Sequence, residues 1–319
     1  MELLPVQLRA IRYEAEGIST FEFRSTGAQP LPPFTAGAHI DLHLASGLVR
    51  SYSLCNSQDE SDRYVVGVNR DRNSRGGSRL MHDTLKVGTV LNISAPRNNF
   101  PLDETAPHSM LIGGGIGITP MLCMLRRLES LGRPWTLHYC ARNRASAAFV
   151  DELTALQAGS KVGTLHLHFD DESNGQFLSL QKVVAEAPAG AHFYCCGPLP
   201  MLAAYEEATR DLPPGRMHVE YFSAKEAPST SGGFVVELAN SGKTIEVPEG
   251  KTILDMLLDA GVDVPYSCME GVCASCETRV IEGVPDHRDL VLTKEEQASN
   301  KVMMVCCSGS KSPKLVLDL

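Results

Sequence analysis

Cysteines near the C-terminal end of the chain have a spacing with chemical meaning. Cys268, Cys273 and Cys276 follow the pattern C-x4-C-x2-C, and Cys306 and Cys307 come much later in the sequence. This is the spacing of thiolate ligands around a plant-type [2Fe–2S] cluster. Cysteines that are merely buried have no reason to adopt it. The sequence therefore predicts a cluster with three ligands in one loop and either Cys306 or Cys307 as the fourth.

The loop between the first three cysteines contains small residues. Gly271, Ala274 and Ser275 allow the backbone to close around a cluster and to direct N–H groups at its sulfur atoms. A cluster of this kind accepts one electron at a time. The rest of the chain is therefore expected to supply single electrons.

Length, composition and charge narrow the classes of protein to consider. The chain has 319 residues, which predicts two or three domains. It opens with Met1-Glu2-Leu3 and no basic or apolar leader, and it has no run of 18 apolar residues, so we expect a cytoplasmic protein outside the membrane. The net charge of −9 argues against nucleic acid as a partner. Residues 233–319 carry 14 acidic and 8 basic side chains, which form either a solvated surface or a docking face for a basic partner.

Residues 1–104 contain short β segments separated by Gly, Pro and Asn. This pattern is typical of an antiparallel β-barrel. The expected strands are residues 6–13, 20–25, 39–43, 49–54, 64–68 and 90–93.

Two motifs in this region suit a flavin. An Arg-x-Tyr-Ser-Leu strand offers a guanidinium for a phosphate and a tyrosine that can lie along the flavin, and a Gly-Gly-Ser turn offers N–H groups at a helix start. Each motif alone is weak, because such turns are common. In this order, they predict a flavin cradle. Its residues are Arg50, Tyr52, Ser53, Leu54, Gly76, Gly77 and Ser78.

Residues 105–224 show alternating strands and helices, which predicts a parallel sheet covered by helices. The expected strands are 110–112, 135–140, 164–169, 192–195 and 218–222, and the expected helices are 121–131, 148–156, 180–187 and 202–209.

Two glycine-rich turns end strands of this predicted sheet. The first contains Gly114 and Gly115, and it leads to Thr119 as the expected N-cap of a helix and Pro120 as its first residue. Glycines at such a turn let the backbone approach a pyrophosphate at a helix N-terminus.

The second turn follows the strand at 192–195 and contains Cys196, Gly197, Pro198 and Met201. Two such turns on one sheet predict a crevice for a dinucleotide. Cys196 is either a buried thiol without a role or a residue beside the nicotinamide.

The last part of the chain has its own pattern. Residues 225–233 are small and polar, which predicts a flexible linker. Residues 234–319 combine a hairpin, a helix and the cluster loop, and we interpret them as an α+β ferredoxin domain of the β-grasp type. His287 is expected to be a surface histidine and not a ligand, because four cysteines already complete the cluster site.

These motifs, in this order along the whole chain, resemble the phthalate dioxygenase reductase family. Residues 33–40 and 51–56 look most like the reductase components of vanillate O-demethylase systems. The resemblance implies FMN in the barrel, NADH on the middle domain and a separate Rieske-type oxygenase as the electron acceptor. FMN is favoured over FAD because related reductases with an N-terminal ferredoxin generally use FAD, whereas this ferredoxin is C-terminal.

The resemblance also implies roles for single residues. It favours Cys306 as the fourth ligand, because in the family this cysteine is followed by a small residue and Ser. It places Phe222 next to the isoalloxazine ring, although a core role is an alternative, and it brings Thr119 to the flavin edge.

The preference for NADH follows from the resemblance alone. Arg142 and Arg144, at the end of the strand 135–140, would by themselves favour the 2′-phosphate of NADPH. Family members with a similar Ala-Arg use NADH, which implies that Arg142 contacts the ribose or the pyrophosphate.

We therefore predict a monomeric reductase component that takes a hydride from NADH onto FMN. It passes single electrons through the [2Fe–2S] cluster to a Rieske non-haem iron oxygenase in aromatic degradation. A flavin must stand between NADH and the cluster, because a hydride delivers two electrons and the cluster accepts one. The alternatives are a reductase for a non-Rieske hydroxylase and a redox-sensing module, although no DNA-reading motif or basic patch supports the latter.

Overall fold

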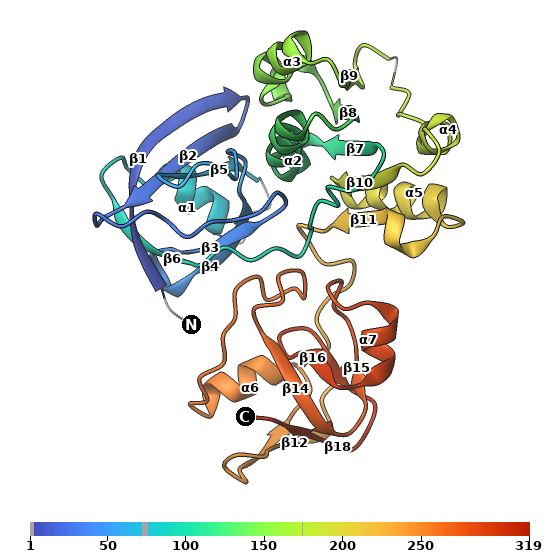
Figure 1. Cartoon of the computed structure of the whole chain (residues 1–319). Coiled ribbons are helices and arrows are strands. Elements are labelled where there is room, and N and C mark those ends of the chain that lie inside the picture. Colours follow the sequence, from blue (N-terminus) through green and yellow to red (C-terminus); the bar gives the residue numbers. More distant parts are fainter. Residues whose placement is uncertain (1–2, 72–75, 174) are drawn as a thin grey trace. The chain divides into compact units, whose positions relative to one another are not determined.

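The computed structural model describes residues 3–71, 76–173 and 175–319. The chain forms two compact units, of which the larger ends at Glu220 and the smaller begins at Tyr221 (Figure 1).

The larger unit begins with an antiparallel barrel of six strands in the order β4-β3-β6-β1-β2-β5. An isolated bridge between Leu54 and Val66 joins the residue after β4 to β5, and so connects the two ends of this strand order. All six predicted strands are present. The elements are β1 Leu3–Ala15, β2 Ile18–Ser25, β3 His39–His43, β4 Val49–Ser53, β5 Tyr64–Asn69, α1 Gly77–Asp83 and β6 Val90–Ser94, with a short 3-10 turn at Ala45–Gly47.

The second part of the larger unit is a five-stranded sheet in the order β11-β10-β7-β8-β9, in which all neighbouring strands are parallel. Figure 1 shows α2 and α3 on one side of this sheet and α4 and α5 on the other. The strands are β7 Ser109–Gly114, β8 Trp135–Ala141, β9 Gly163–Phe169, β10 His192–Cys196 and β11 Met217–Glu220. The helices are α2 Ile118–Leu131, α3 Val150–Gly159, α4 Leu180–Glu186 and α5 Leu199–Thr209, with 3-10 turns at Gly115–Gly117, Arg144–Ser146 and Pro214–Arg216.

Three predicted helix starts are wrong, and one of them is the start of α5, which lies at Leu199 and not at residue 202. Helix α2 begins at Ile118 with Gly117 as its N-cap, so Thr119 lies inside the first turn, where its Oγ1 donates to the Ile116 carbonyl at 2.9 Å. Helix α3 begins two residues later than expected, because Phe149 has a left-handed backbone with φ of 63° and cannot continue a helix.

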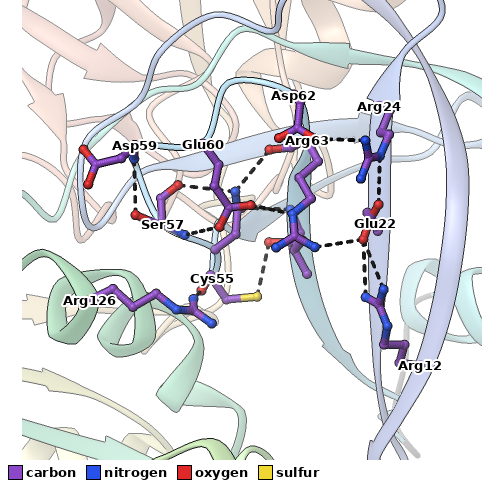
Figure 2. Close-up of polar contacts among 12 residues, drawn as sticks. Arg12, Glu22, Arg24, Cys55, Ser57, Asp59, Glu60, Asp62, Arg63 and Arg126 are labelled. Carbon is purple, nitrogen blue, oxygen red and sulfur yellow. Dashed lines mark hydrogen bonds and ion pairs between the residues drawn. The ribbon is translucent and has the colours of Figure 1, made fainter. Parts of the chain in front are cut away.

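Arg126 of α2 links the barrel to the sheet. Its guanidinium donates to the backbone carbonyl of Cys55, just beyond β4, and pairs with Glu152 of α3; Figure 2 shows the contact with Cys55. The methyl group of Thr119 lies against the barrel as well, because a Cβ built on Gly67 of β5 would be 2.7 Å from Thr119 Cγ2. The flavin cradle and the glycine turns therefore belong to one packed body.

The smaller unit contains a five-stranded mixed sheet in the order β13-β12-β18-β14-β16 and a two-stranded ladder of β15 and β17. This confirms an α+β ferredoxin domain, and the predicted hairpin and helix are present. The elements are β12 Phe234–Leu238, β13 Thr244–Val247, α6 Ile253–Asp259, β14 Glu277–Glu282, β15 Pro285–Asp286, α7 Lys294–Ser299, β16 Val302–Met304, β17 Gly309–Ser310 and β18 Lys314–Leu317.

Residues of the predicted linker contact this ferredoxin body. The Ser229 N–H donates to the Cys307 carbonyl at 2.7 Å, and Ser229 is buried. Arg288 Nη1 lies 3.4 Å from Glu226 Oε2. Part of the segment 225–233 is therefore ordered against the ferredoxin domain. Within the described ranges, no helix has the length and apolar character needed to cross a membrane.

Candidate functional site

The predicted flavin cradle is assembled at the junction of β4 and α1. A Cβ built on Gly77 would lie 2.6 Å from Arg50 Cγ and 3.0 Å from its Nε. Gly76 has φ of 99°, a conformation that residues with side chains rarely adopt. The two glycines thus let the Arg50 side chain lie directly against the start of α1. Ser78 is on the same turn, and its Oγ accepts a hydrogen bond from the Asp71 N–H at 3.3 Å.

A buried carboxylate positions the β4 strand. Asp41 of β3 accepts a hydrogen bond from Ser51 Oγ at 2.6 Å and pairs with Arg97 at 2.7 Å. Burial alone would raise the pKa of Asp41, but Arg97 and Ser51 hold it below its ordinary value. Burial raises the pKa of Tyr52 to about 12, so this phenol stays neutral and can donate a hydrogen bond. Leu54 is fully buried at the end of the motif.

The two glycine turns meet at the C-terminal edge of the parallel sheet. A Cβ on Gly114 would lie 2.7 Å from Pro198 Cδ, and a Cβ on Gly197 would lie 2.8 Å from Met201 Sδ. Gly115 has φ of 55°, and a Cβ built there would meet nothing within 4 Å. Gly114 and Gly197 are therefore required by the packing of the two turns, whereas Gly115 borders open space that a pyrophosphate can approach. Pro120 is buried in the first turn of α2.

Sequence reasoning missed Glu220, which joins the flavin cradle to the nucleotide turns. It is the last residue of β11 and pairs in register with Cys196 of β10. Its Oε2 accepts a hydrogen bond from Ser53 Oγ at 3.4 Å. Burial raises the pKa of Glu220 to about 8, so the carboxyl is mainly protonated at neutral pH. In the sequence, the only sign of Glu220 was an acidic residue inside the predicted strand 218–222.

The other predicted residues of this region have different surroundings. Cys196 is fully buried, and burial raises the pKa of its thiol well above the usual value, so the sulfur is neutral. Arg142 is exposed beyond β8, and its backbone carbonyl accepts a hydrogen bond from the Asp171 N–H at 3.1 Å. Phe222 is 42% exposed within the smaller unit, and its place next to the flavin stays a prediction.

The cluster loop directs backbone N–H groups at sulfur, as expected. The N–H groups of Glu270 and Val272 donate to Cys268 Sγ at 3.3 and 3.4 Å, and the Cys268 N–H donates to Cys273 Sγ at 3.5 Å. The backbone needed for this is unusual, because Met269, Gly271 and Ala274 have φ values of 59°, 71° and 61°. These donors suit a group that places negative charge on the sulfurs, as a [2Fe–2S] cluster does.

The structure distinguishes Cys306 from Cys307. The Cys306 thiol interacts with the thiols of Cys268 and Cys276 as well as with Cys307. Cys307 Sγ instead lies 3.7 Å from the Met304 carbonyl, and a Cβ on Gly271 would lie 2.4 Å from it. The geometry therefore favours Cys306 as the fourth ligand.

No three His, Cys, Asp or Glu side chains of the described residues converge on a single metal ion. That is compatible with a [2Fe–2S] cluster, whose four cysteines are shared between two irons. The N–H donors at the sulfurs fit this group, and Cys268, Cys273, Cys276 and Cys306 are the residues that would hold it.

Comparisons with known proteins support both a [2Fe–2S] domain and a NAD-binding domain in this chain. Residues 236–310 match the 2Fe-2S iron-sulfur cluster binding domain, and residues 111–207 match the oxidoreductase NAD-binding domain. The chain is 55% identical to phenoxybenzoate dioxygenase subunit beta of Ectopseudomonas oleovorans, over 99% of this chain and 98% of that protein. It is 51% identical to tetrachlorobenzoquinone reductase of Sphingobium chlorophenolicum, with coverages of 96% and 94%. It is 42% identical to vanillate O-demethylase oxidoreductase of Pseudomonas sp. (strain HR199 / DSM 7063), with coverages of 99% and 100%.

Two solved structures extend the comparison to the whole fold. Phthalate dioxygenase reductase, described as a modular structure for electron transfer from pyridine nucleotides to [2Fe–2S], is 39% identical with a TM-score of 0.75, over 99% of this chain and 98% of that chain. An intact type IV self-sufficient cytochrome P450 monooxygenase is 38% identical with a TM-score of 0.88, but this chain spans only 41% of that protein.

These results define an oxidoreductase with a NAD-binding domain and a [2Fe–2S] domain. The chain belongs to the phthalate dioxygenase reductase family. The expected cofactor set of FMN, NADH and a [2Fe–2S] cluster is the one that this family uses.

Proposed function

We propose that this chain is the reductase component that carries electrons from NADH, through FMN and the [2Fe–2S] cluster, to a separate Rieske non-haem iron oxygenase. The observation that carries the proposal is the contact between Ser53 of the cradle and Glu220 at the nucleotide edge, in a chain that also holds the four-cysteine loop. When bound, FMN supplies the conversion of a two-electron donor into single electrons. We also propose that the protein is a monomer and that it acts in the cytoplasm.

Each group of residues has a defined task in this proposal. Arg50 and the N–H groups at Gly77 hold the flavin phosphate, while Tyr52 lies along the flavin. The turns at Gly115 and Gly197 accept the pyrophosphate of NADH. Ser53, Cys196 and Glu220 form an uncharged, buried polar cluster at neutral pH beside the predicted position of the nicotinamide. The family resemblance assigns Thr119 and Phe222 to the flavin.

The purified protein tests the electron-transfer function directly. With NADH, it should reduce cytochrome c in repeated turnovers, and the Cys306→Ser variant should lose most of this activity while still reducing ferricyanide through the flavin. A redox-sensing module would instead show one reduction of its cofactors and no turnover.

The names of the relatives point to different electron acceptors. The names of the phenoxybenzoate and vanillate relatives favour an oxygenase partner. The P450 structure favours a haem acceptor, and the tetrachlorobenzoquinone relative favours a quinone. Bleaching of a Rieske oxygenase by NADH only when this chain is present would support the Rieske partner. Faster reduction of a P450 haem or of a quinone would replace it.

Glu220 predicts a pH dependence of NADH oxidation. Its carboxyl is protonated below about pH 8 and becomes an anion above it. That anion would oppose negative charge that the flavin gains, so activity should fall as pH rises through about 8. Glu220→Gln stays neutral and should lose this alkaline limb, measured as kcat against pH with ferricyanide as acceptor.

A surface carboxyl provides the control. Glu207→Gln on α5 changes an exposed side chain that pairs with Arg210 and should keep the wild-type profile. An alkaline limb that persists unchanged in Glu220→Gln would show that another group causes it.

The residues that follow β8 and β9, next to Arg142, predict a preference for NADH. Arg144 lies 4.7 Å over the Phe169 ring and 3.5 Å from Glu172, so its guanidinium is engaged within the protein. Asp170 and Asp171 follow β9 directly, and their N–H groups bond the carbonyls of Ala141 and Arg142 at 3.1 Å. A 2′-phosphate would meet these carboxylates, and repulsion between charges about 4 Å apart costs about 1 kcal/mol even in water.

We expect kcat/KM to be about 10-fold or more higher with NADH than with NADPH, because about 1.4 kcal/mol corresponds to a factor of ten. Steady-state rates with both nucleotides measure this ratio. A higher value with NADPH would overturn it, and Arg142→Ala and Arg144→Ala would then show which guanidinium recognises the extra phosphate.

A further inference from the structure

His287 and Asp289 form a buried polar pair in the ferredoxin unit. Their side chains are 8% and 0% exposed, and His287 Nδ1 lies 3.5 Å from Asp289 Oδ1. The expectation of a surface histidine is therefore wrong. Both ring nitrogens and Oδ1 lack a hydrogen-bond partner among the described residues. Burying polar atoms without hydrogen-bond partners costs folding free energy, so the presence of this pair requires an explanation.

Asp289 lies directly behind the cluster loop. The N–H of Leu290 donates to the Gly271 carbonyl at 2.9 Å. A Cβ built on Gly271 would lie 2.9 Å from Asp289 Cα. The loop thus packs against this segment without space between them, and a shift of Asp289 must move Gly271.

Gly271 connects this contact to the cluster ligands. It separates Glu270 and Val272, whose N–H groups donate to Cys268 Sγ at 3.3 and 3.4 Å. Hydrogen bonds to ligand sulfurs stabilise negative charge on a cluster and help to set its reduction potential. The position of Gly271 therefore controls two of these donors.

Asp289 is fixed from its other sides by ordinary hydrogen bonds. Its Oδ2 accepts from the Leu292 N–H at 2.9 Å, and its carbonyl accepts from Gln297 Nε2 of α7 at 3.3 Å. The Arg288 N–H donates to Ser308 Oγ at 3.3 Å, next to the segment of Cys306. Among the residues that the structure describes, none makes a hydrogen bond with Oδ1, and His287 Nδ1 lies 3.5 Å from this atom.

We propose that His287 and Asp289 are positioning residues for the [2Fe–2S] cluster. They hold the segment behind Gly271, keep the Glu270 and Val272 N–H groups on Cys268, and so set cluster retention and reduction potential. This inference rests on the proposed cluster function, and neither residue is a ligand.

The full-length protein with its cluster tests the proposal. In His287→Gln and in the isosteric Asp289→Asn, cluster release to an iron chelator should be about 10-fold or more faster, as for other residues that support metal ligands. The midpoint potential of His287→Gln, followed by electron paramagnetic resonance, should shift to a more negative value, because loosened N–H···S bonds stabilise the reduced cluster less. A purely structural role would change unfolding without changing this potential.

Two further variants provide a milder change in the same segment and a control elsewhere in the chain. Gln297→Ala removes one support of Asp289 more gently and should show smaller changes in the same direction, even if the stronger variants fold poorly. His166→Gln replaces an exposed histidine of β9 and should match the wild type. Wild-type potential and release rate in a fully loaded His287→Gln protein would overturn the inference. Absence of a cluster from the wild type would instead overturn the cluster assignment itself.

Discussion

Replacing Cys306 with serine is expected to abolish the visible absorption of the [2Fe–2S] cluster while the flavin spectrum persists. The thiol of Cys306 interacts with those of Cys268 and Cys276, so its loss removes one of four ligands. The cradle around Arg50 lies in the other compact unit, so the flavin spectrum is expected to persist. Absorption spectra and iron content of the purified variants measure the result.

Cys307→Ser is the matched control, because the two cysteines are adjacent and equally buried, at 3% and 2% exposure. Cys307 points toward the Met304 carbonyl and fills the space beside Gly271, so serine there should spare the cluster. Serine at Cys268, Cys273 or Cys276 should reproduce the loss. The opposite result for the adjacent pair would make Cys307 the fourth ligand.

Local patterns predicted the strands of the larger unit, whereas β15 to β18 and α7 of the smaller unit were not predicted. Short β segments separated by Gly, Pro and Asn identified all six barrel strands, and the cysteine spacing identified the cluster loop. The start of α2 was missed because Gly117 takes the N-cap position, although Thr119 has a favourable side chain for it. A Cβ on Gly117 would be 2.2 Å from the Cys196 carbonyl oxygen, so tertiary packing determines that position.

Glu220 could not be found from local pattern. Its partner Ser53 lies 167 positions away in the sequence, and Cys196 faces it only through the register of β10 and β11. Its high pKa also depends on burial by both parts of the larger unit. Such a contact becomes visible only when the barrel and the parallel sheet are placed together.

For His287, the sequence predicted an exposed side chain, whereas the structure shows a buried one. The polar run from Asp286 to Asp289 reads as surface, and two of its members do form ion pairs there, since Arg288 Nη2 lies 3.0 Å from Asp286 Oδ2. The run turns inward at His287 and Asp289 because the next residue, Leu290, bonds the cluster loop at Gly271. Composition alone does not reveal which members of a polar run are buried.

Arg50→Ala is expected to weaken FMN binding by about 10- to 100-fold, because a hydrogen bond between charged groups contributes roughly 1.5–3 kcal/mol. In the structure, the Arg50 side chain lies against Gly77 at the start of α1, which is where a phosphate would meet both the guanidinium and backbone N–H groups. Titration of the flavin-free protein with FMN, and flavin content after extensive dialysis, measure the change.

Two variants separate the phosphate contact from general effects of charge. Arg50→Lys keeps the positive charge but loses the planar guanidinium, so its FMN affinity should lie between the wild type and Arg50→Ala. Arg9→Ala removes an exposed arginine of β1 whose Nη1 bonds Gln7, and it should bind FMN as the wild type does. The cluster spectrum should be normal in all three variants. If Arg50→Ala retained full flavin after dialysis, the phosphate would have to bind elsewhere in the barrel, and the Arg50 and Gly77 cradle would lose its assigned role.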